Sequence, residues 1–471
     1  MGILGRIDTF ITWFDGVVWG LPLIILILVT GIFLTVRLGL LQVRYLGKAL
    51  KFMVKNEEDG HGEVTSFGAL CTALSATIGT GNIVGVATAI SAGGPGALFW
   101  MILTAFLGMA TKYSEGLLAV KYRTIDEDGH VLGGPFYYIE NGMGVKFRWL
   151  AKIFAFFGAG VGLFGIGTFT QVNGISSAVR NFFDPNMAHT VALFGNDYSW
   201  ATVISCLVLT VCVGMVVLGG IKRIAKVSEI VVPFMAVLYV VLAVIIMVTN
   251  ITAIPAAIVT IVKSAFTGSA LAGGAMGSMI VAMQKGIARG IFSNEAGLGS
   301  APIAAAAALT DSPGQQVLIS MLGTFIDTIV ICTMTGLSIV IAGTWNIGLE
   351  GVAVTTKAFQ MTLPFPEQFS SFILMICLVF FAFTTILGWD YYSEKCLEYL
   401  SNGNQKVVKG YRWLYILAVF IGPYMTVSAV WTIADIFNGL MAIPNLIALV
   451  ALSGVVVSET KIYLKRIGKV S

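Results

Sequence analysis

The chain has 471 residues, of which 57% are hydrophobic and 11% are charged, and its mean hydropathy is +0.89. Soluble globular domains carry about 25% charged residues, so this composition excludes an ordinary soluble protein and predicts an all-α polytopic membrane protein. The net charge of +4 does not indicate a nucleic-acid partner, because the basic residues lie in loops beside apolar segments. The expected surroundings are the lipid bilayer, and no nucleic acid is expected to bind.

Residues 1–60 are predicted to form an N-terminal segment with one membrane span. Residues 1–16 mix apolar and charged residues in a way that suits a short interfacial helix, and Val17–Val36 is long and apolar enough to cross a bilayer. A basic loop follows, with Arg37, Arg44, Lys48, Lys51 and Lys55. The positive-inside rule places this loop in the cytoplasm and the N-terminus outside.

Residues 61–250 predict a first repeat of five spans. These are Phe67–Ser91, Gly96–Tyr122, Trp149–Phe182, Trp200–Gly219 and Val227–Val248. The third is expected to be one long helix. Residues 251–284 then form a connection, in which Pro255, Lys263 and the pair Gly273-Gly274 favour an outer-surface or re-entrant helix over a span.

Residues 285–471 predict a second repeat of five spans and a cytoplasmic C-terminus. The spans are about Lys285–Leu309, Val317–Ile341, Phe369–Tyr392, Leu414–Val430 and Ile433–Val457. Basic residues such as Lys461 and Arg466 place the C-terminus inside. The total is about eleven spans. Because each repeat has an odd number of spans, the two repeats cross the membrane in opposite directions, which predicts a 5+5 inverted repeat after one additional N-terminal span.

The first span of the first repeat is interrupted by Ala76-Thr77-Ile78-Gly79-Thr80-Gly81-Asn82. Two glycines one residue apart weaken a helix, and lipid cannot satisfy the backbone groups that a break sets free. Such a break offers carbonyls for a cation at the end of its first half-helix and amides for a carboxylate at the start of its second. The pattern is typical of the binding site of a secondary transporter.

The same pattern returns 218 residues later. The matching positions are Gly79 and Gly297, Gly81 and Gly299, Pro95 and Pro313, Gly96 and Gly314, and Asn82 and Ser300. Paired glycine-interrupted segments in two halves of a chain point to the binding site of a transporter. A second break facing the first is therefore expected. Its residues are Ser293, Asn294, Glu295, Ala296 and Gly297.

Two longer stretches resemble a known family. Gly93-Gly94-Pro95-Gly96-Ala97-Leu98-Phe99-Trp100-Met101, ending at Gly108, is similar to the signature of the alanine or glycine:cation symporter family. Ser293-Asn294-Glu295-Ala296-Gly297-Leu298-Gly299-Ser300-Ala301-Pro302 is similar to its second hallmark. The resemblance covers nearly the whole chain and departs at Ile102, where the family has tryptophan. It implies a leucine-transporter-like fold, sodium-coupled uptake of alanine or glycine, and alternating access.

The first break gives a candidate site for the amino acid. The amides at Thr80 and Gly81 and the Thr80 hydroxyl are expected to bind the substrate carboxylate, and the Thr77 carbonyl to bind its ammonium. Asn82 lies in the same break. The family resemblance adds Gln171, which would face the substrate, although a hydrogen bond between helices is the alternative.

The facing break and the eighth helix of the repeat core complete the candidate pocket. Glu295 is an ionisable group at membrane depth, for which a structural role and direct contact with substrate or cation both stay open. Trp389 matches a family tryptophan that closes the pocket, with an interfacial position as the alternative.

The fold implied by the resemblance also carries a sodium site. It would be formed by the hydroxyls of Thr384 and Thr385 and the carbonyls of Ser75, Ile78 and Phe381. Threonine hydroxyls also bond back to their own helix, which is the competing interpretation.

Four further ionisable positions need an interpretation. Asp327 is an intramembrane acid for which a coupling or proton-sensitive role is expected. Asp390, Glu394 and Lys395, near a helix end, are expected to form a solvated network on the inner side.

The sequence thus predicts an inner-membrane symporter for alanine or glycine that needs no cofactor and uses sodium as its coupling ion. The alternative is a proton-coupled carrier of the same fold that uses Glu295 or Asp327. A channel is disfavoured because it would need a continuous polar pore. An intramembrane enzyme is disfavoured because it would need paired acids or a His-Glu-x-x-His pattern. The preference among small amino acids and the oligomeric state stay open.

Overall fold

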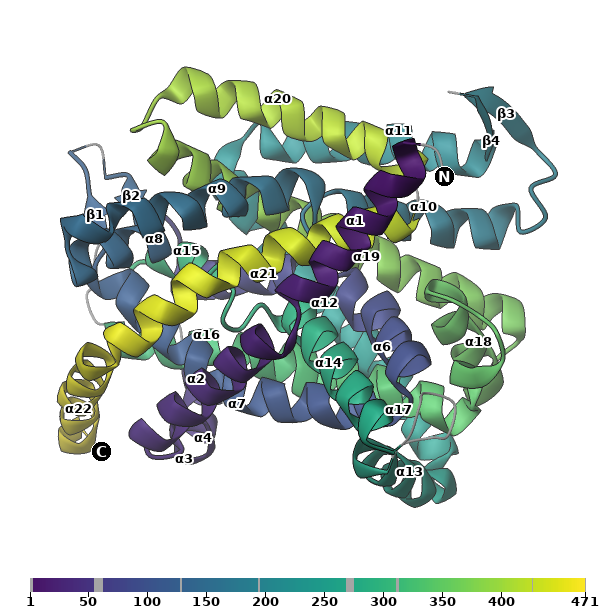
Figure 1. Cartoon of the computed structure of the whole chain (residues 1–471), viewed down its shortest axis with the longest axis horizontal. Helices are drawn as coiled ribbons and strands as arrows, with labels where there is room; N and C mark the ends of the chain where they lie inside the picture. The colour runs from purple at the N-terminus through teal and green to yellow at the C-terminus, as the bar shows by residue number, and fades with distance from the viewer. Residues whose placement is uncertain are drawn as a thin grey trace.

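The computed structural model describes residues 3–54, 62–127, 129–193, 195–267, 275–310, 313–425 and 427–470. Helices make up most of it (Figure 1). Lys55 and residues 268–274 of the expected connection lie outside the described residues.

The α-helices are α1 Ile3–Val18, α2 Leu21–Arg37, α3 Leu41–Arg44, α4 Leu46–Val54, α5 Ser66–Thr77, α6 Val86–Gly93, α7 Gly96–Lys121, α8 Pro135–Tyr137, α9 Arg148–Phe164, α10 Phe169–Phe183, α11 Trp200–Val217, α12 Gly220–Thr249, α13 Ile254–Phe266, α14 Ala275–Asn294, α15 Ala301–Ala306, α16 Pro313–Thr324, α17 Thr333–Ala342, α18 Val352–Thr362, α19 Glu367–Leu400, α20 Gln405–Ile421, α21 Val427–Ala451 and α22 Ser453–Val470. Wider π-helical turns lie at Gly81–Gly85, Tyr138–Gly142 and Phe325–Cys332. Two short antiparallel hairpins pair β1 Thr124–Ile125 with β2 Val131–Leu132, and β3 Thr190–Leu193 with β4 Asn196–Ser199.

The apolar helices agree with a polytopic membrane protein. Among the described residues, eight helical segments are long and apolar enough to cross a membrane, and α5 with the bent continuation Gly81–Gly93 makes a ninth. The two other expected spans correspond to α14 with α15 and to α20, which has only 17 residues. The count of eleven therefore stays a prediction.

The third expected span lies within one candidate span, Val145–Phe183, but its helix is interrupted, so only the expectation of a single unbroken helix was wrong. It consists of α9 and α10, with an interruption at residues 165–168. At Gly167 an added Cβ would lie 2.8 Å from Cβ of Trp389, so this close approach to α19 requires glycine.

Two helix boundaries also differ from the expectation. α14 begins at Ala275, so residues 275–284, which the sequence places in the connection, form the first turns of this helix. The span expected to end at Val430 closes earlier, because α20 ends at Ile421 and α21 already begins at Val427.

Two long helices, α7 and α19, organise the packing. α7 packs against α2, α14, α15 and α16, and α19 packs against α5, α9, α10 and α12. A Cβ at Gly388 of α19 would lie 2.8 Å from Cβ of Ala76, so glycine permits the contact with α5. α1 lies beside α21 (Figure 1), and the Trp19 indole donates to the Asp435 carbonyl at 2.8 Å.

The helices α5 and α15 are tied together at the ends farthest from their breaks. The chain before α5 pairs with the chain after α15, through Glu63 N to Ala307 O at 2.8 Å and Leu309 N to Val64 O at 2.7 Å. Arg123, just after α7, donates to the carbonyls of Ala306 and Ala308. Both half-helices therefore have one end at a break and the other end in the same group of polar contacts. We call this group, formed by residues 63–64, Arg123 and residues 306–309, the polar seam.

Candidate functional site

The first break lies where α5 meets the π-helical turn Gly81–Gly85, and the two halves are bent by 47°. In a continuous helix the amides of Gly79 and Thr80 would donate to the carbonyls of Ser75 and Ala76. Here Gly79 N donates to Asn82 Oδ1 at 2.8 Å, and Thr80 N donates to Gln171 Oε1 at 3.0 Å. The break thus frees carbonyls at the end of α5.

The glycines of the first break allow close contacts with three other elements. A Cβ at Gly79 would lie 2.4 Å from Thr385 Oγ1 and 2.9 Å from Gln171 Oε1. A Cβ at Gly81 would lie 3.1 Å from Cα of Ser293, at the end of α14. The two breaks therefore touch each other directly, as the repeat pattern predicts.

The second break separates α14 from α15. Glu295 has a left-handed φ of 58°, and Gly297 and Gly299 also have positive φ, so the chain leaves the helical path at this point. Glu115 of α7 accepts a hydrogen bond from Gly297 N at 3.0 Å, and Asn445 of α21 donates to Gly297 O at 2.9 Å. Side chains from neighbouring helices thus satisfy the freed backbone groups.

Asp327 connects the two breaks. It lies in the π-helical turn Phe325–Cys332, and its carboxylate accepts hydrogen bonds from Asn82 Nδ2 at 2.6 Å and from Ser293 Oγ at 2.9 Å. The Thr328 hydroxyl donates to it at 2.6 Å. Asp327, which the sequence places inside a membrane span, is therefore the centre of the polar contacts between the half-helices.

The oxygens expected to bind sodium lie between α5 and α19. Thr385 Oγ1 is 3.2 Å from the Ile78 carbonyl and 3.0 Å from the Phe381 carbonyl. Thr384 Oγ1 is 3.0 Å from the same Phe381 oxygen. Both hydroxyls therefore donate back to carbonyls of their own helix, as the competing interpretation predicts, and only Thr385 also reaches α5, through the Ile78 carbonyl. Uncharged hydroxyl and carbonyl oxygens of this kind are ligands that suit a hard cation.

Of the groups expected to bind the carboxylate, the Thr80 amide has a partner within the protein, whereas the Thr80 hydroxyl has none among the described residues. The Thr80 amide is bonded to Gln171, whose Nε2 donates to Ile166 O at 3.0 Å, so Gln171 joins the first break to the chain before α10. The Thr80 hydroxyl has no hydrogen-bond partner, although it is fully buried. The Thr77 hydroxyl bonds back to Ala73 O and Leu74 O of its own helix.

The residues expected in the second break fall into two groups. Ser293 faces Asp327 and the first break, whereas Asn294 caps the end of α14, with Oδ1 accepting from Ala296 N and Nδ2 donating to Thr328. Glu295 Oε2 accepts from the Ser300 hydroxyl at 2.7 Å. Among the described contacts of this group, only those of Ser293 reach the first break directly.

Trp389 is fully buried, so the interfacial alternative is wrong for this side chain. It packs against Gly167 and forms a T-shaped contact with Tyr392, with ring centroids 5.5 Å apart. The indole lies next to Glu295. It therefore covers the second break on the side of the α9 and α10 interruption.

The site is closed to solvent. Thr80, Asn82 and Trp389 are 0% exposed, and Gln171 is 1% exposed. Beside the second break, a cavity of about 10 Å³ is lined by Gly108, Ala296 and Gly297 among others, which is room for one water molecule at most. The residues of the first break and Trp389 are therefore shielded from water in this structure.

Sequence reasoning missed two charged residues of α7. Lys112 Nζ donates to Asn294 O at 2.7 Å, and Glu115 accepts from Gly297 N, so both touch the second break. The available signal was the presence of ionisable residues inside the expected span Gly96–Tyr122, which normally marks a functional or paired group.

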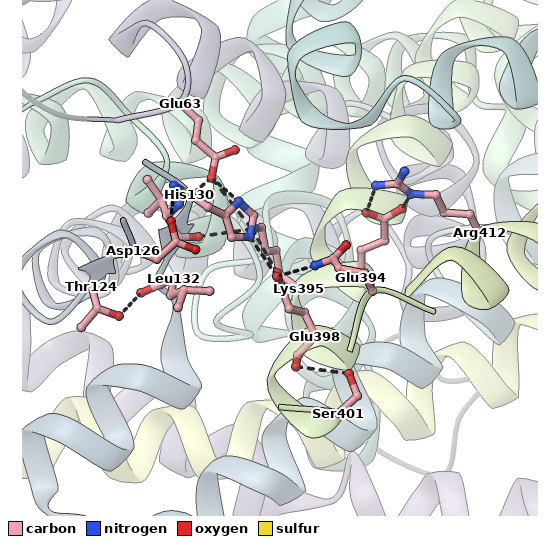
Figure 2. Close-up of polar contacts among 12 residues, drawn as sticks. Glu63, Thr124, Asp126, His130, Leu132, Glu394, Lys395, Glu398, Ser401 and Arg412 are labelled. Atoms are coloured by element: carbon pink, nitrogen blue, oxygen red, sulfur yellow. Dashed lines mark hydrogen bonds and ion pairs between the residues drawn. The ribbon is translucent and has the colours of Figure 1, made fainter. Parts of the chain in front are cut away.

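A second polar cluster lies at the seam where α5 begins and α15 ends (Figure 2). We call it the His130 cluster, formed by Glu63, His130, Lys395 and Glu398. His130 Nδ1 lies 3.1 Å from Glu63 Oε1 and Nε2 lies 2.8 Å from Glu398 Oε1, while Lys395 Nζ lies 3.1 Å from Glu398 Oε2. The cluster joins the start of α5, the β1–β2 hairpin and the end of α19.

The residues near this end of α19 do not form the solvated network that the sequence predicts. Asp390 is fully buried, and Glu394 and Lys395 are each 7% exposed. Arg412 of α20 pairs with Glu394, so packing between α19 and α20 shields the charges from water (Figure 2).

Comparison with known proteins gives a consistent result. The chain matches the sodium:alanine symporter family over residues 5–470. It is 49% identical over 458 residues to a sodium/alanine symporter, AgcS, of Methanococcus maripaludis, covering 95% of each chain. It is 37% identical over 455 residues to a probable sodium/glutamine symporter, GlnT, of Bacillus subtilis, covering 96% of this chain and 90% of that protein. A putative sodium/proton-dependent alanine carrier protein, YrbD, of Bacillus subtilis is 36% identical over 460 residues, covering 94% and 90%.

The buried, interrupted helices and these relatives together define an amino-acid:cation symporter that crosses the membrane several times, and not an enzyme. More particularly, the chain belongs to the sodium:alanine symporter family. The family resemblance drawn from the two sequence motifs is therefore confirmed.

Proposed function

We propose that the chain couples the inward movement of sodium to the uptake of alanine or glycine by alternating access. Its fold would be the leucine-transporter-like 5+5 inverted repeat with one leading span, placed in the inner membrane with the N-terminus outside and the C-terminus in the cytoplasm. The observation that carries the proposal is the junction of α5 with α19, where Thr385 Oγ1 lies within 3.2 Å of the carbonyls of Ile78 and Phe381.

A cation at this junction would hold α5 against α19. The carbonyl end of a half-helix carries partial negative charge, and the hydroxyls of Thr384 and Thr385 add ligands from the facing helix. Binding from the sodium-rich side would favour the arrangement with both helices in contact, and release on the other side would loosen it.

The amino acid would bind across the two breaks. Its carboxylate would replace the Gln171 carboxamide oxygen as the acceptor for the Thr80 amide, beside the unpartnered Thr80 hydroxyl and Gly81. Its ammonium would bind to the Thr77 carbonyl and to groups of the second break. The small residues at the two breaks, Gly79, Gly81 and Ala296, suit a small amino acid.

The test is uptake of labelled alanine and glycine into proteoliposomes, driven by an inward sodium gradient, for wild type and Thr385→Val. The substitution keeps the shape and removes one ligand, and losing one such contact at about 1–3 kcal/mol predicts a decrease in apparent sodium affinity of roughly fivefold to 150-fold. Thr356→Val is the matched control, since among the described residues this hydroxyl of α18 donates back to Val352 O of its own helix. Unchanged sodium affinity in Thr385→Val would refute the site, and no accumulation of either amino acid would refute the substrate assignment.

A proton-coupled carrier of the same fold is the second candidate, because the Asp327 carboxyl accepts hydrogen bonds from both breaks. Protonation would change these contacts and so the fit between the half-helices. Uptake driven by a proton gradient without sodium, and lost in Asp327→Asn, would support this candidate against sodium coupling.

A further inference from the structure

The two breaks differ in how the partial charges at their helix ends are compensated. At the first break the groups around the Ile78 carbonyl are the uncharged hydroxyls and carbonyls of α19. At the second break, α7 provides a charge for each end. Lys112 Nζ donates to the Asn294 carbonyl at the end of α14, and Glu115 accepts from Gly297 N three residues further on.

The signs of these charges fit the break. The last carbonyls of a helix attract positive charge, and free amides attract negative charge. Lys112 and Glu115 are three residues apart on one helix, so they lie on the same face of α7 and reach the two ends of the break together. The second break thus contains, as side chains, the cation and the carboxylate that the first break would take from solution.

Lys112 is buried among carboxyl groups and does not lie on the surface. It is 2% exposed, and the carboxyl groups of Glu295, Glu115 and Asp327 interact electrostatically with its ammonium. A buried ammonium at membrane depth requires such compensating charge. Its position next to a helix-end carbonyl is the position that an inorganic cation would take in a broken helix.

The repeat pattern makes the asymmetry visible in the sequence. The positions 218 residues after Lys112 and Glu115 are Val330 and Thr333, which carry no charge. The matching helix of the second repeat therefore lacks this charged pair at the equivalent positions, and only α7 carries it.

We propose that the ammonium of Lys112 is a permanent cation of the second break, which excludes an exchangeable ion there, so that one sodium ion accompanies each amino acid. This inference rests on the proposed function. Lys112 acts as a positioning residue, because it reaches the substrate region through the backbone of α14. Transport of one sodium with a zwitterion moves one net charge per amino acid.

The experiment measures sodium and alanine fluxes in the same proteoliposomes, together with the membrane potential at which alanine flux reverses. Wild type is expected to move one charge per alanine and to show a Hill coefficient of one for sodium. A ratio of two charges per alanine with sodium-driven uptake intact would overturn the inference alone. Uptake without sodium dependence would overturn the proposed function as well.

Variants at position 112 separate an ionic role from simple packing. Lys112→Arg keeps the charge and is expected to keep the ratio of one. Lys112→Met removes it, and sodium is expected to enter the second break, which raises the Hill coefficient above one. If Lys112→Met does not fold, the double variant Lys112→Met with Glu115→Gln removes both charges and is measured instead. Lys263→Met, in the exposed part of α13, is the control, and an unchanged Hill coefficient in folded Lys112→Met would contradict the proposal.

Discussion

At the scale of single residues, glycine decides how closely the elements of the site approach. Gly79 lies against Thr385 and Gln171, Gly81 against Ser293, and Gly388 against Ala76. At each of these positions even one methyl group would lie about 3 Å or less from a neighbouring atom. The contacts between the broken helix and α19 therefore depend on missing side chains as much as on the polar groups present.

We predict that Gly79→Ala lowers sodium-driven uptake, because its Cβ would lie 2.4 Å from Thr385 Oγ1. Overpacking costs typically 1–3 kcal/mol, which corresponds to a decrease of roughly fivefold to 150-fold in the population of the closed state. The measurement is alanine uptake at saturating sodium. Gly410→Ala in α20 is the control, since no atom lies within 4 Å of its Cβ, and normal uptake in both variants would contradict the expectation.

At the scale of elements, α14 is held on both sides of its C-terminal end. Arg289, six residues before the break, forms a bidentate ion pair with Asp435 of α21, with both N to O distances at 2.7 Å. Its guanidinium also stacks over Trp431, with 4.7 Å to the ring centroid. The pair fixes α14 against α21, while Lys112 and Asp327 hold its end.

We predict that Arg289→Ala lowers the free energy of unfolding by about 3–5 kcal/mol, because it leaves the Asp435 carboxylate buried without a partner. Thermal unfolding in detergent measures the change. Replacing both partners, by Arg289→Met with Asp435→Leu, is expected to recover most of the stability. Lys357→Ala removes an exposed pair with Glu367 and is expected to cost at most about 0.5 kcal/mol. A loss as small for Arg289→Ala would show that the pair does not hold α14.

At the scale of the whole molecule, the described residues of both breaks are buried, and the ends of α5 and α15 are joined where the chain before α5 pairs with the chain after α15. The His130 cluster lies at this polar seam and connects it to the end of α19 (Figure 2). Opening the site on this side would require α5 to separate from α15 and α19, which would break these ion pairs.

The hydrogen bonds that His130 donates to Glu398 and Glu63 raise its pKa from 6.5 to about 9. Since the raised pKa belongs to the folded protein, this stabilisation is complete below pH 6.5 and is lost as the pH rises through about 9. We predict that the thermal unfolding temperature of wild type falls between pH 6.5 and 9, and that His130→Gln removes this part of the decline. His189→Gln, in an exposed loop, is the control and should keep the wild-type profile. A pH profile in His130→Gln identical to wild type would exclude the cluster as the cause.

The sequence by itself determined the class of protein and the location of its breaks. Apolar composition is sufficient to require membrane helices, and a glycine pair inside a span interrupts it through local backbone physics alone. The 218-residue spacing predicted the second break at Ser293–Gly297, and in the structure the chain is non-helical between Asn294 and Ala301, so the predicted and observed positions overlap without coinciding. The start of α14 lies ten residues earlier than expected. The family resemblance pointed to the oxygens of Thr385 and Ile78, which lie together in the structure.

Only the tertiary structure decided which distant side chains meet these breaks. Lys112 and Glu115 contact the second break across about 180 residues of chain, and Asp327 reaches Asn82 across 245. Gln171 takes the Thr80 amide, and Trp389 fits against Gly167 where the third expected span is interrupted. Helical periodicity describes each helix alone, whereas these pairings depend on the angle and register at which helices pack, which no single segment contains.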